Sequence, residues 1–595
     1  NFYRRGRKSC TIIIRGKSNE KPVIHLFLCL LCIERIEKML EIKPSTKNWN
    51  TRGEDTAARL KDGSAYAKGK IVAAEDTVKL LEAVLRPGDK VNIEGDNQKQ
   101  ADFLAKQLCE VDPTKVHDLH MIQSTLSIPE HLDVFEKGIA HKLDFAYAGS
   151  QGKRLAQMVQ NGGVELGAIH TYLEMYSRYF IDLVPRVSLV TADAADAEGN
   201  IYTGFSTEDT PAIVEATKFN QGIVIFQVNK IVDKLPRVDI PADWVDYVIE
   251  SPTPYMLNPL FTRDPAKITN ERILKAMMAI KGIYAEYGVK VLNHGVGFDT
   301  AAVELILPTF AENLGLRGKI CTHWVLNPHP TLIPAIETGW AQAIYSFGSE
   351  VGMEEYIKAR SDIFAIGPDG TMRSNRAFAQ AAGHYAADMF IGSTMQIDRF
   401  GNSSTATKNN VAGFGGAPNM GCDAKGRRHV TEAWKKAGEE VANRYELMGD
   451  RNRGKKLVVQ MITTVSEKGF PGFVEQLDAV ALQKNANLDL EPIMIYSDDL
   501  THIVSEVGIA YLHKCHNMEE RMNAIRAVAG KTEVGKLEDP EITKKLRKEG
   551  IVKLPEDLGV NPAEATRDLL AAKNMKDLVD WSGGLYDPPA KFRNW

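Results

Sequence analysis

The stretch EYGVKVLNHGVGFDTAAVELIL, residues 286–307, combines a turn, a short apolar strand, two closely spaced glycines and a helical pattern. Asp299 or Thr300 suits the N-cap of that helix. An earlier stretch, RPGDKVNIEGDNQKQADFLAKQL at 86–108, has the same order of turn, strand, glycine and helix. The two strand-to-glycine segments begin 200 residues apart, which raises the prospect of an internal repeat.

A second pair of short motifs recurs at almost the same spacing. DAEGN at 196–200 and DRFGN at 398–402 share the pattern D-x-x-G-N and lie 202 residues apart. Each follows an apolar run that suits a strand, RVSLVTA in the first case and DMFIGSTMQI in the second. Two matched landmarks at nearly one offset indicate an ancient duplication, so we expect two similar halves.

Apolar runs and helical patterns alternate along both halves, as in GIVIFQVNKIV, KLVVQMITTV and NERILKAMMAIKGIYAEY. This alternation predicts an α/β fold with mainly parallel sheets. We expect a first domain at 39–264 and a second at 265–512. The charged, helical pattern that follows predicts a C-terminal helical extension at 513–595.

The composition, 44% hydrophobic and 25% charged, is typical of soluble globular proteins. A formal net charge of −4 leaves no overall basic footprint, which argues against nucleic acid as a main partner. Seven cysteines without the spacing of a disulfide scaffold favour a reducing, cytoplasmic setting.

Residues 1–38 depart from this composition. They are basic, and the apolar stretch VIHLFLCLLCI at 23–33 is too short to span a bilayer, which needs about 20 residues. No small-residue cleavage site follows it, and the first methionine is Met39. We expect 1–38 to be an extraneous or disordered extension, with a targeting or anchoring segment as the alternative, and we expect no stable membrane insertion.

The segment GNSSTATKNNVAGFGGAPNMG, residues 401–421, is a candidate cradle for an anion or an oxyanion. Three of the four residues at 413–416 are glycines, which permit positive φ and close backbone approach. Successive N–H groups in such a turn form an anion nest. A flexible surface loop is the alternative, and the residues alone do not decide between them. The GxG of HGVGFDT at 294–300 lacks the third glycine of a dinucleotide fingerprint and equally suits a tight turn.

Glu337, in PAIETGWAQA, precedes small residues and is a candidate carboxylate nucleophile. Glu250 and Glu350 have similar local surroundings, and a solvated surface charge explains each of the three at least as well. The paired histidines at 117 and 120 and at 323 and 329 lack cysteine or carboxylate companions at ligand spacing. We therefore predict no metal site and assign these histidines to the core, the surface or a supporting role.

Taken together, NHGVGFDTAAVEL, MQIDRFGN, GFGGAPN and THIVSEVGIAYL resemble the coenzyme A transferase superfamily, in which two α/β half-domains face each other across a thioester site. NWNTRGEDTAARL at 48–60, GNSSTAT and YSDDLTHIVSEVGIAYLHKC are more closely similar to the α subunits of biotin-independent malonate decarboxylases. The resemblance spans about residues 45 to 530. It implies two CoA-transferase-like half-domains.

The resemblance implies a reaction: acetyl-S-carrier plus malonate gives malonyl-S-carrier plus acetate. The carrier is an acyl carrier protein with a dephospho-CoA-type arm, and separate decarboxylase subunits then decarboxylate the malonyl thioester. The chain itself is expected to bind no cofactor. The order makes chemical sense, because a thioester carbonyl stabilises the enolate formed by decarboxylation and free malonate offers no such electron sink.

The same resemblance implies roles for particular residues. Gly415 and Gly416 are the expected oxyanion donors, and Glu337 matches the position of the superfamily glutamate. Either that glutamate carries the acyl group, or the entering acid attacks the thioester directly. We expect Glu337→Gln to abolish transfer while leaving the fold intact. The expected contacts to the substrate or to the thioester arm are Gly295, Gly297, Gly413 and Asn402. Malonate also needs a cationic partner, for which Lys408 and Arg178 are candidates between which the sequence does not choose.

Two other functions are compatible with these motifs. One is related chemistry on another acid, as in a citrate lyase α subunit or a free CoA transferase, and a substrate screen separates it from the malonate reaction. The other is a catalytically silent scaffold that only docks the carrier and decarboxylase subunits. Malonate-dependent acetate release by the isolated chain would exclude the scaffold.

Overall fold

The computed structural model describes residues 49–95, 99–372, 374–441, 453–593 and 595. Apart from the start of the first described helix, everything below lies in the compact unit Thr56–Trp595. The expectation for residues 1–38 falls outside the described residues.

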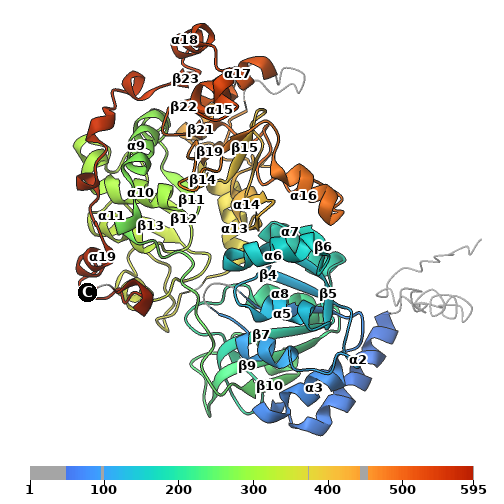
Figure 1. Cartoon of the computed structure of the whole chain (residues 1–595). Helices are drawn as coiled ribbons and strands as arrows, with labels where there is room; N and C mark the ends of the chain where they lie inside the picture. The colour runs from blue at the N-terminus through green and yellow to red at the C-terminus, as the bar shows by residue number, and fades with distance from the viewer. Residues whose placement is uncertain (1–48, 96–98, 373, 442–452, 594) are drawn as a thin grey trace, which may run out of the picture. The chain divides into compact units, whose positions relative to one another are not determined.

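The first half of the chain builds a ten-stranded sheet that is mainly parallel (Figure 1). Its path places β3 between β7 and β4, and only β1 and β8 pair antiparallel to their neighbours. In sheet order the strands are β1 (Ala67–Lys68), β2 (Ile71–Val72), β10 (Tyr247–Glu250), β9 (Ile223–Ile231), β7 (Val187–Ala195), β3 (Lys90–Ile93), β4 (Leu119–Thr125), β5 (Ala140–Tyr147) and β6 (Glu165–Ile169), with β8 (Ile201–Tyr202) beside β7.

The second half builds an eight-stranded sheet with the same parallel centre (Figure 1). In sheet order its strands are β13 (Ala343–Tyr345), β12 (His323–Val325), β11 (Val291–His294), β14 (Met389–Ser393), β19 (Leu457–Met461), β21 (His502–Val504), β22 (Ile509–Tyr511) and β23 (Val552–Lys553). Smaller pairings join β15 (Gln396–Asp398) to β16 (Ser403–Ser404) and β20 (Phe473–Val474), and β17 (Ala406–Thr407) to β18 (Asn410–Val411).

Helices connect the strands of both sheets, as parallel pairing requires. In the first half they are α2 (Trp49–Gly63), α3 (Thr77–Val84), α4 (Asp102–Leu108), α5 (Glu130–Glu136), α6 (Gly152–Gln160), α7 (Tyr172–Ile181) and α8 (Thr210–Phe219). In the second half they are α9 (Asn270–Ala279), α10 (Phe298–Ile306), α11 (Ile333–Glu337), α12 (Glu354–Ala359), α13 (Arg376–Ala386), α14 (Ala417–Met420), α15 (Glu432–Glu439) and α16 (Asp478–Ala486). After residue 513 come α17 (Met518–Val528), α18 (Pro540–Lys548) and α19 (Met575–Trp581).

The core lies on both faces of the sheets. Along β9, Ile223 and Ile225 belong to one apolar cluster, whereas Val224 and Phe226 belong to another. Successive side chains of a strand point to opposite faces, so helices cover both sides of this sheet. Fully burying each such side chain contributes roughly 1.5–3 kcal/mol before the entropy of ordering is subtracted.

The two sheets share one strand order, which confirms the predicted α/β fold with two similar halves. The path β10-β9-β7-β3-β4-β5 in the first sheet corresponds to β21-β19-β14-β11-β12-β13 in the second. The strands β3 and β11, which hold the repeated strand-to-glycine motif, occupy the same place in each path.

The D-x-x-G-N motifs form the same turn twice. In the first copy, the Asn200 amide donates to Asp196 Oδ1 at 2.9 Å, and the Asn200 side chain donates to Asp196 Oδ2 at 2.8 Å. In the second copy, Asn402 makes the same two bonds to Asp398, at 2.9 and 3.0 Å. The glycine of each turn has φ near +90°, at 92° and 94°. The motif is therefore a structural corner in both halves.

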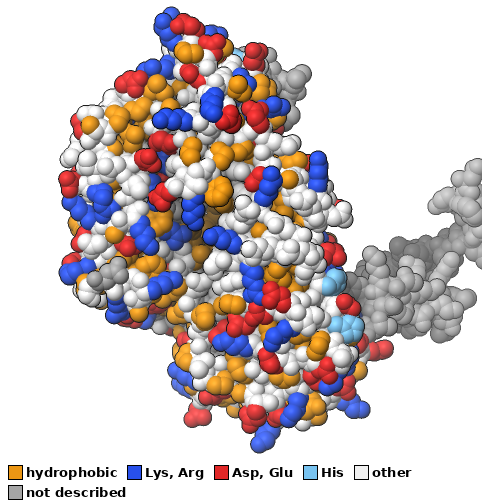
Figure 2. Space-filling model, in the orientation of Figure 1, with side chains coloured by type: hydrophobic (Ala, Val, Ile, Leu, Met, Phe, Trp, Pro, Cys, Tyr) orange, Lys and Arg blue, Asp and Glu red, His pale blue; other side chains and the backbone are white. Residues whose placement is uncertain are grey.

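The C-terminal region is not purely helical, because β23 pairs with β22 and extends the second sheet. The proposed domain boundaries stay a prediction. On the face shown in Figure 2, Lys and Arg side chains are interspersed with Asp and Glu, and neither sign dominates. Among the helices of the described ranges, none combines the length and the apolar character needed to cross a bilayer.

Candidate active site

A cavity of ≈ 230 Å³ is lined by residues of both halves. Tyr147, His294 and Ser393, which line it, are the last residues of β5, β11 and β14. Ligands of α/β proteins bind at the carboxyl ends of parallel strands, so this is the expected place for a site. Segment 412–417, which contains the glycine cluster, forms another part of the lining.

Segment 412–417 is held firmly against the first half. The Phe414 and Gly415 amides both donate to the carbonyl oxygen of Ala146, at 2.7 and 3.0 Å. Gly413 and Gly415 adopt φ values of 76° and 57°, which favour glycine. The flexible-loop alternative therefore does not apply to residues 412–417, which form a fixed wall of the cavity.

Only one of the two expected oxyanion donors has an N–H available for a ligand. The Gly415 N–H is already bonded to Ala146, so it is not available to a ligand. Within the described part of the chain, no acceptor is bonded to the Gly416 N–H. Gly416 is thus the better candidate donor of the pair.

The repeated strand-to-glycine motif of the second half contributes the turn after β11. The Gly295 amide donates to Ile391 O at 2.7 Å, and the Thr300 hydroxyl donates back to Gly295 O at 2.7 Å. Val296 lines the cavity two residues before the start of α10, and no bonded acceptor for its N–H lies in the described ranges. A free amide beside a helix N-terminus favours negative charge.

Two histidines of the lining share one buried glutamate. Glu304 Oε1 accepts from His294 Nδ1 and from His329 Nδ1, each at 2.9 Å. The hydroxyl of Thr331 donates to the other oxygen, Oε2. Tyr284 Oη lies 2.7 Å from His294 Nε2. Glu304 itself is fully buried and lies behind the lining.

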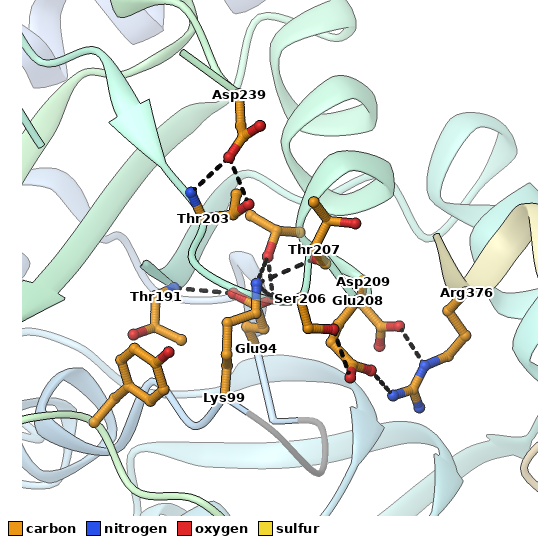
Figure 3. Close-up of polar contacts among 12 residues, drawn as sticks. Glu94, Lys99, Thr191, Thr203, Ser206, Thr207, Glu208, Asp209, Asp239 and Arg376 are labelled. Carbon is orange, nitrogen blue, oxygen red and sulfur yellow. Dashed lines mark hydrogen bonds and ion pairs between the residues drawn. The ribbon is translucent and has the colours of Figure 1, made fainter. Parts of the chain in front are cut away.

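Arg376, at the start of α13, supplies the guanidinium cation of the lining. It is paired with carboxylates of the first half. Its guanidinium binds Glu208 and lies 2.9 Å from Asp209 Oδ1, as Figure 3 shows. All three side chains are at most 3% exposed. The two carboxylates raise the pKa of Arg376 well above its usual value against the opposing effect of burial.

The Arg376 pair also fixes the backbone around Glu208. Glu208 has φ of 48°, a left-handed conformation that is uncommon outside glycine. Its Oε1 accepts from the Ser349 amide at 3.1 Å, and a Cβ at Gly348 would overlap that carboxylate. Strained non-glycine residues cluster at functional sites, which fits a position beside the cavity.

A second buried ion pair lies at the end of β3, also shown in Figure 3. Lys99 Nζ lies 3.5 Å from Glu94 Oε1 and donates to Thr207 O at 3.1 Å. The Thr191 amide donates to Glu94 Oε2 at 2.9 Å. Glu94 occupies the place in the first half that His294 occupies in the second, but neither Glu94 nor Lys99 lines the cavity.

Glu337, the predicted catalytic carboxylate, does not line the cavity. It ends α11, and its Oε1 accepts from Tyr356 Oη at 2.7 Å and pairs with Arg360 Nη1 at 2.5 Å. The side chain is 31% exposed. The nearby guanidinium and phenol hold its carboxylate at the surface, so this placement gives the nucleophile hypothesis no support.

Of the other predicted contacts, Gly295, Gly413, Gly415 and Gly416 line the cavity. Gly297, Asn402, Lys408 and Arg178 do not.

Each of those four residues has another role. Gly297 caps α10, and Asn402 closes the second D-x-x-G-N turn. Lys408 Nζ is largely exposed and lies 3.5 Å from Asp478. Arg178 pairs with Asp182 at 2.5 Å and lines a separate groove.

Sequence reasoning missed the polar residues that approach the cavity from the second half. Asn327 and His329 follow β12 within the motif NPHP, and their place after a strand was the available signal. Arg376 and Gln380 project from α13 and gave no local signal, because their partners lie far away in the chain.

The polar groups of the lining are amides, hydroxyls, imidazoles and one guanidinium, set among apolar side chains such as Phe261, Phe390 and Met494. No Asp or Glu side chain lines the cavity in the described ranges. Nor do those ranges contain a group of three or more His, Cys, Asp or Glu side chains placed to hold a metal ion.

Comparison with known proteins identifies relatives over most of the chain. Residues 48–595 match the family described as "Malonate decarboxylase, alpha subunit, transporter". The chain is 63% identical over 550 residues to the acetyl-S-ACP:malonate ACP transferase of Malonomonas rubra, covering 92% of this chain and 99% of that one.

Solved structures agree with this relationship. The chain is similar to a Pseudomonas malonate decarboxylase hetero-tetramer in complex with malonate (55% identity, TM-score 0.88), covering 92% of this chain and 99% of that one. It is equally similar to a malonate decarboxylase α subunit from Acinetobacter baumannii (56% identity, TM-score 0.88), covering 92% and 100%. A citrate lyase α subunit from Streptococcus mutans, at 14% identity and TM-score 0.52, covers 79% and 84% and shares the fold. The chain therefore belongs to the malonate decarboxylase α-subunit family.

Proposed function

We propose that this chain transfers the thiol of an acyl carrier protein from acetate to malonate, as the first step of biotin-independent malonate decarboxylation. The observation that carries the proposal is the 63% identity to an acetyl-S-ACP:malonate ACP transferase along 99% of that protein. The cavity adds support, because it combines a fixed glycine wall with free amides at Gly416 and Val296.

The proposed partners follow from the same relationship. They are an acyl carrier protein, the decarboxylase subunits, malonate and acetate, in a cytoplasmic complex. The solved Pseudomonas relative is a hetero-tetramer, which favours a role within a larger assembly. The chain would bind no cofactor of its own and would act on a dephospho-CoA-type arm of the carrier.

For the mechanism, we favour direct attack of malonate on the thioester. One malonate carboxylate oxygen adds to the acetyl carbonyl, the thiolate leaves, and a mixed acetyl–malonyl anhydride forms. The thiolate then attacks the malonyl carbonyl and expels acetate. Both tetrahedral intermediates carry an oxyanion, for which the Gly416 and Val296 amides are suitable donors. The absence of a carboxylate in the described lining supports this route over an acyl-glutamate.

The test uses malonate labelled with ¹⁸O in its carboxylates and a single turnover of acetyl-carrier. Mass spectrometry of the carrier arm should show conversion of acetyl to malonyl, and the released acetate should carry one ¹⁸O atom. Transfer without label in the first-turnover acetate would overturn direct attack, because an enzyme carboxylate would then have supplied that oxygen. No malonyl-carrier with malonate, but turnover with citrate or succinate, would overturn the malonate assignment itself.

Glu337→Gln is expected to retain transfer within about twofold of the wild type. The reason is that Glu337 lies outside the lining and is engaged with Arg360 and Tyr356 at the surface. Exposed ion pairs of this kind contribute only about 0–1 kcal/mol to stability. Malonate-dependent acetate release measures the effect. A loss of more than a hundredfold with unchanged melting temperature would return Glu337 to the reaction.

A further inference from the structure

The buried carboxylate of Glu304 determines where protons lie in the wall of the cavity. It accepts hydrogen bonds from three donors: His294 Nδ1, His329 Nδ1 and the Thr331 hydroxyl. Three donors around one carboxyl group suit its ionised form, which is acceptor-only. Burial alone would raise the pKa of Glu304, but His329 and His294 lower it to about 2. Both imidazoles therefore carry a proton on Nδ1.

The second nitrogen distinguishes the two histidines. His294 Nε2 lies 2.7 Å from Tyr284 Oη. Burial keeps the pKa of the Tyr284 phenol well above its usual value, so the hydroxyl donates and His294 Nε2 accepts. His294 is then neutral, which agrees with the lowering of its own pKa by burial. For His329 Nε2, the described residues supply no hydrogen-bonding partner, and this ring lines the cavity.

The contact with Glu304 prepares His329 to bind an anion. An ionised carboxylate that accepts from Nδ1–H orients an imidazole and stabilises positive charge on it, as in catalytic triads. His294 is not available in this way, since both of its nitrogens are already bonded. His329 Nε2 is therefore the nitrogen that can donate to an anionic ligand in the cavity. The stacked Phe261 ring, 5.7 Å from the imidazole between centroids, holds its plane.

The other cations near the cavity are less suitably placed for a ligand. Arg376 is bonded to two carboxylates, Glu208 and Asp209, and leaves no net positive charge for a ligand. Arg263 keeps its charge, which acts on Glu304, but it donates to the carbonyl oxygen of Leu260 at 2.7 Å and is not part of the lining. Lys408 and Arg178 lie outside it as well.

We propose that His329, held by Glu304, binds the carboxylate of malonate that does not attack the thioester, and so selects a dicarboxylate over acetate. This rests on the proposed function. The two carboxylates of malonate are separated by one methylene, so both must lie in one small cavity. One of them reaches the thioester carbonyl beside Gly416 and Val296. The other accepts a hydrogen bond from His329 Nε2, and Glu304 acts as a positioning residue for that imidazole.

The experiment compares two reactions of the same chemistry in His329→Gln. The first is acetate release from acetyl-carrier with malonate, and the second is exchange of isotopically labelled acetate into acetyl-carrier. Losing a hydrogen bond to a charged group should raise the KM for malonate about 10- to 100-fold, while acetate exchange falls far less. His323→Gln is the matched control, because His323 is an exposed residue on β12 that contacts Thr322 at 2.9 Å.

Calorimetric titration of malonate into the wild-type and variant chains, without carrier, distinguishes failure of the role of His329 from failure of the proposed function. Tight malonate binding that is lost in His329→Gln supports the inference even if the transfer assay fails for want of partners. Equal losses in malonate and acetate reactions, at unchanged melting temperature, would overturn it. So would loss of malonate selectivity in Arg263→Gln but not in His329→Gln. A wild type that turns over citrate but neither binds nor turns over malonate would overturn the proposed function as well.

Discussion

Arg376→Ala is expected to abolish transfer and to lower the free energy of unfolding by about 3–5 kcal/mol. Removing one partner of a buried ion pair leaves the other charge uncompensated, and such losses have this size. Here the remaining carboxylates would be two, Glu208 and Asp209, each 0% exposed as a side chain. Denaturant unfolding and malonate-dependent acetate release measure the two effects.

Arg360→Ala is the matched control. Arg360 also pairs with two carboxylates, those of Glu337 and Asp362, but at the surface, so its loss should cost less than about 1 kcal/mol. A triple variant, Arg376→Met with Glu208→Gln and Asp209→Asn, removes the charges together and should recover part of the stability without recovering transfer. If Arg376→Ala unfolds no more easily than Arg360→Ala, the ion pairs of Arg376 with Glu208 and Asp209 do not stabilise the fold.

Gly413→Ala is expected to reduce transfer by about 10²- to 10³-fold, the cost of losing one oxyanion donor. A Cβ at this position would overlap the carbonyl oxygen of Ala146, which accepts from Phe414 and Gly415. The backbone must then shift, and the Gly416 amide moves with it. The φ of 76° adds strain to any residue with a Cβ.

Gly370→Ala is the control for Gly413→Ala, because it tests backbone strain at a positive φ without displacing segment 412–417. Gly370 has almost the same φ, 77°, but a Cβ there would meet nothing within 4 Å. It should cost stability of the order of 1 kcal/mol and leave transfer near the wild-type rate. The informative measurement is kcat at saturating malonate. Similar kcat values for the two variants would show that the position of segment 412–417 does not matter to the reaction.

The duplicated architecture could be predicted because its signals are local. The strand-to-glycine motif and the D-x-x-G-N turn each depend on a few neighbouring residues, and both recur at one offset. The structure confirms them as β3 and β11 in equivalent places and as two corners with the same hydrogen bonds. The glycine cluster was found in the same way, since Gly413 and Gly415 adopt positive φ values that favour glycine.

The candidate site could be predicted only in part, because its remaining features depend on distant residues. The Gly415 amide donates to the carbonyl oxygen of Ala146, which belongs to the other half. Arg376 acquires its role from Glu208, 168 residues earlier. Glu337 is paired with Arg360, which is 23 residues away in the chain. No window of sequence around any of these residues contains the partner that decides its function.

The repeated strand order also bears on how the cavity evolved and assembles. Because both copies lie in one polypeptide, the two walls are present in equal number and at high effective concentration, without a separate association step. Each half can then diverge in sequence while its partner half stays the same. The equivalent positions Glu94 and His294 illustrate such divergence: one is part of a buried ion pair, and the other lines the cavity.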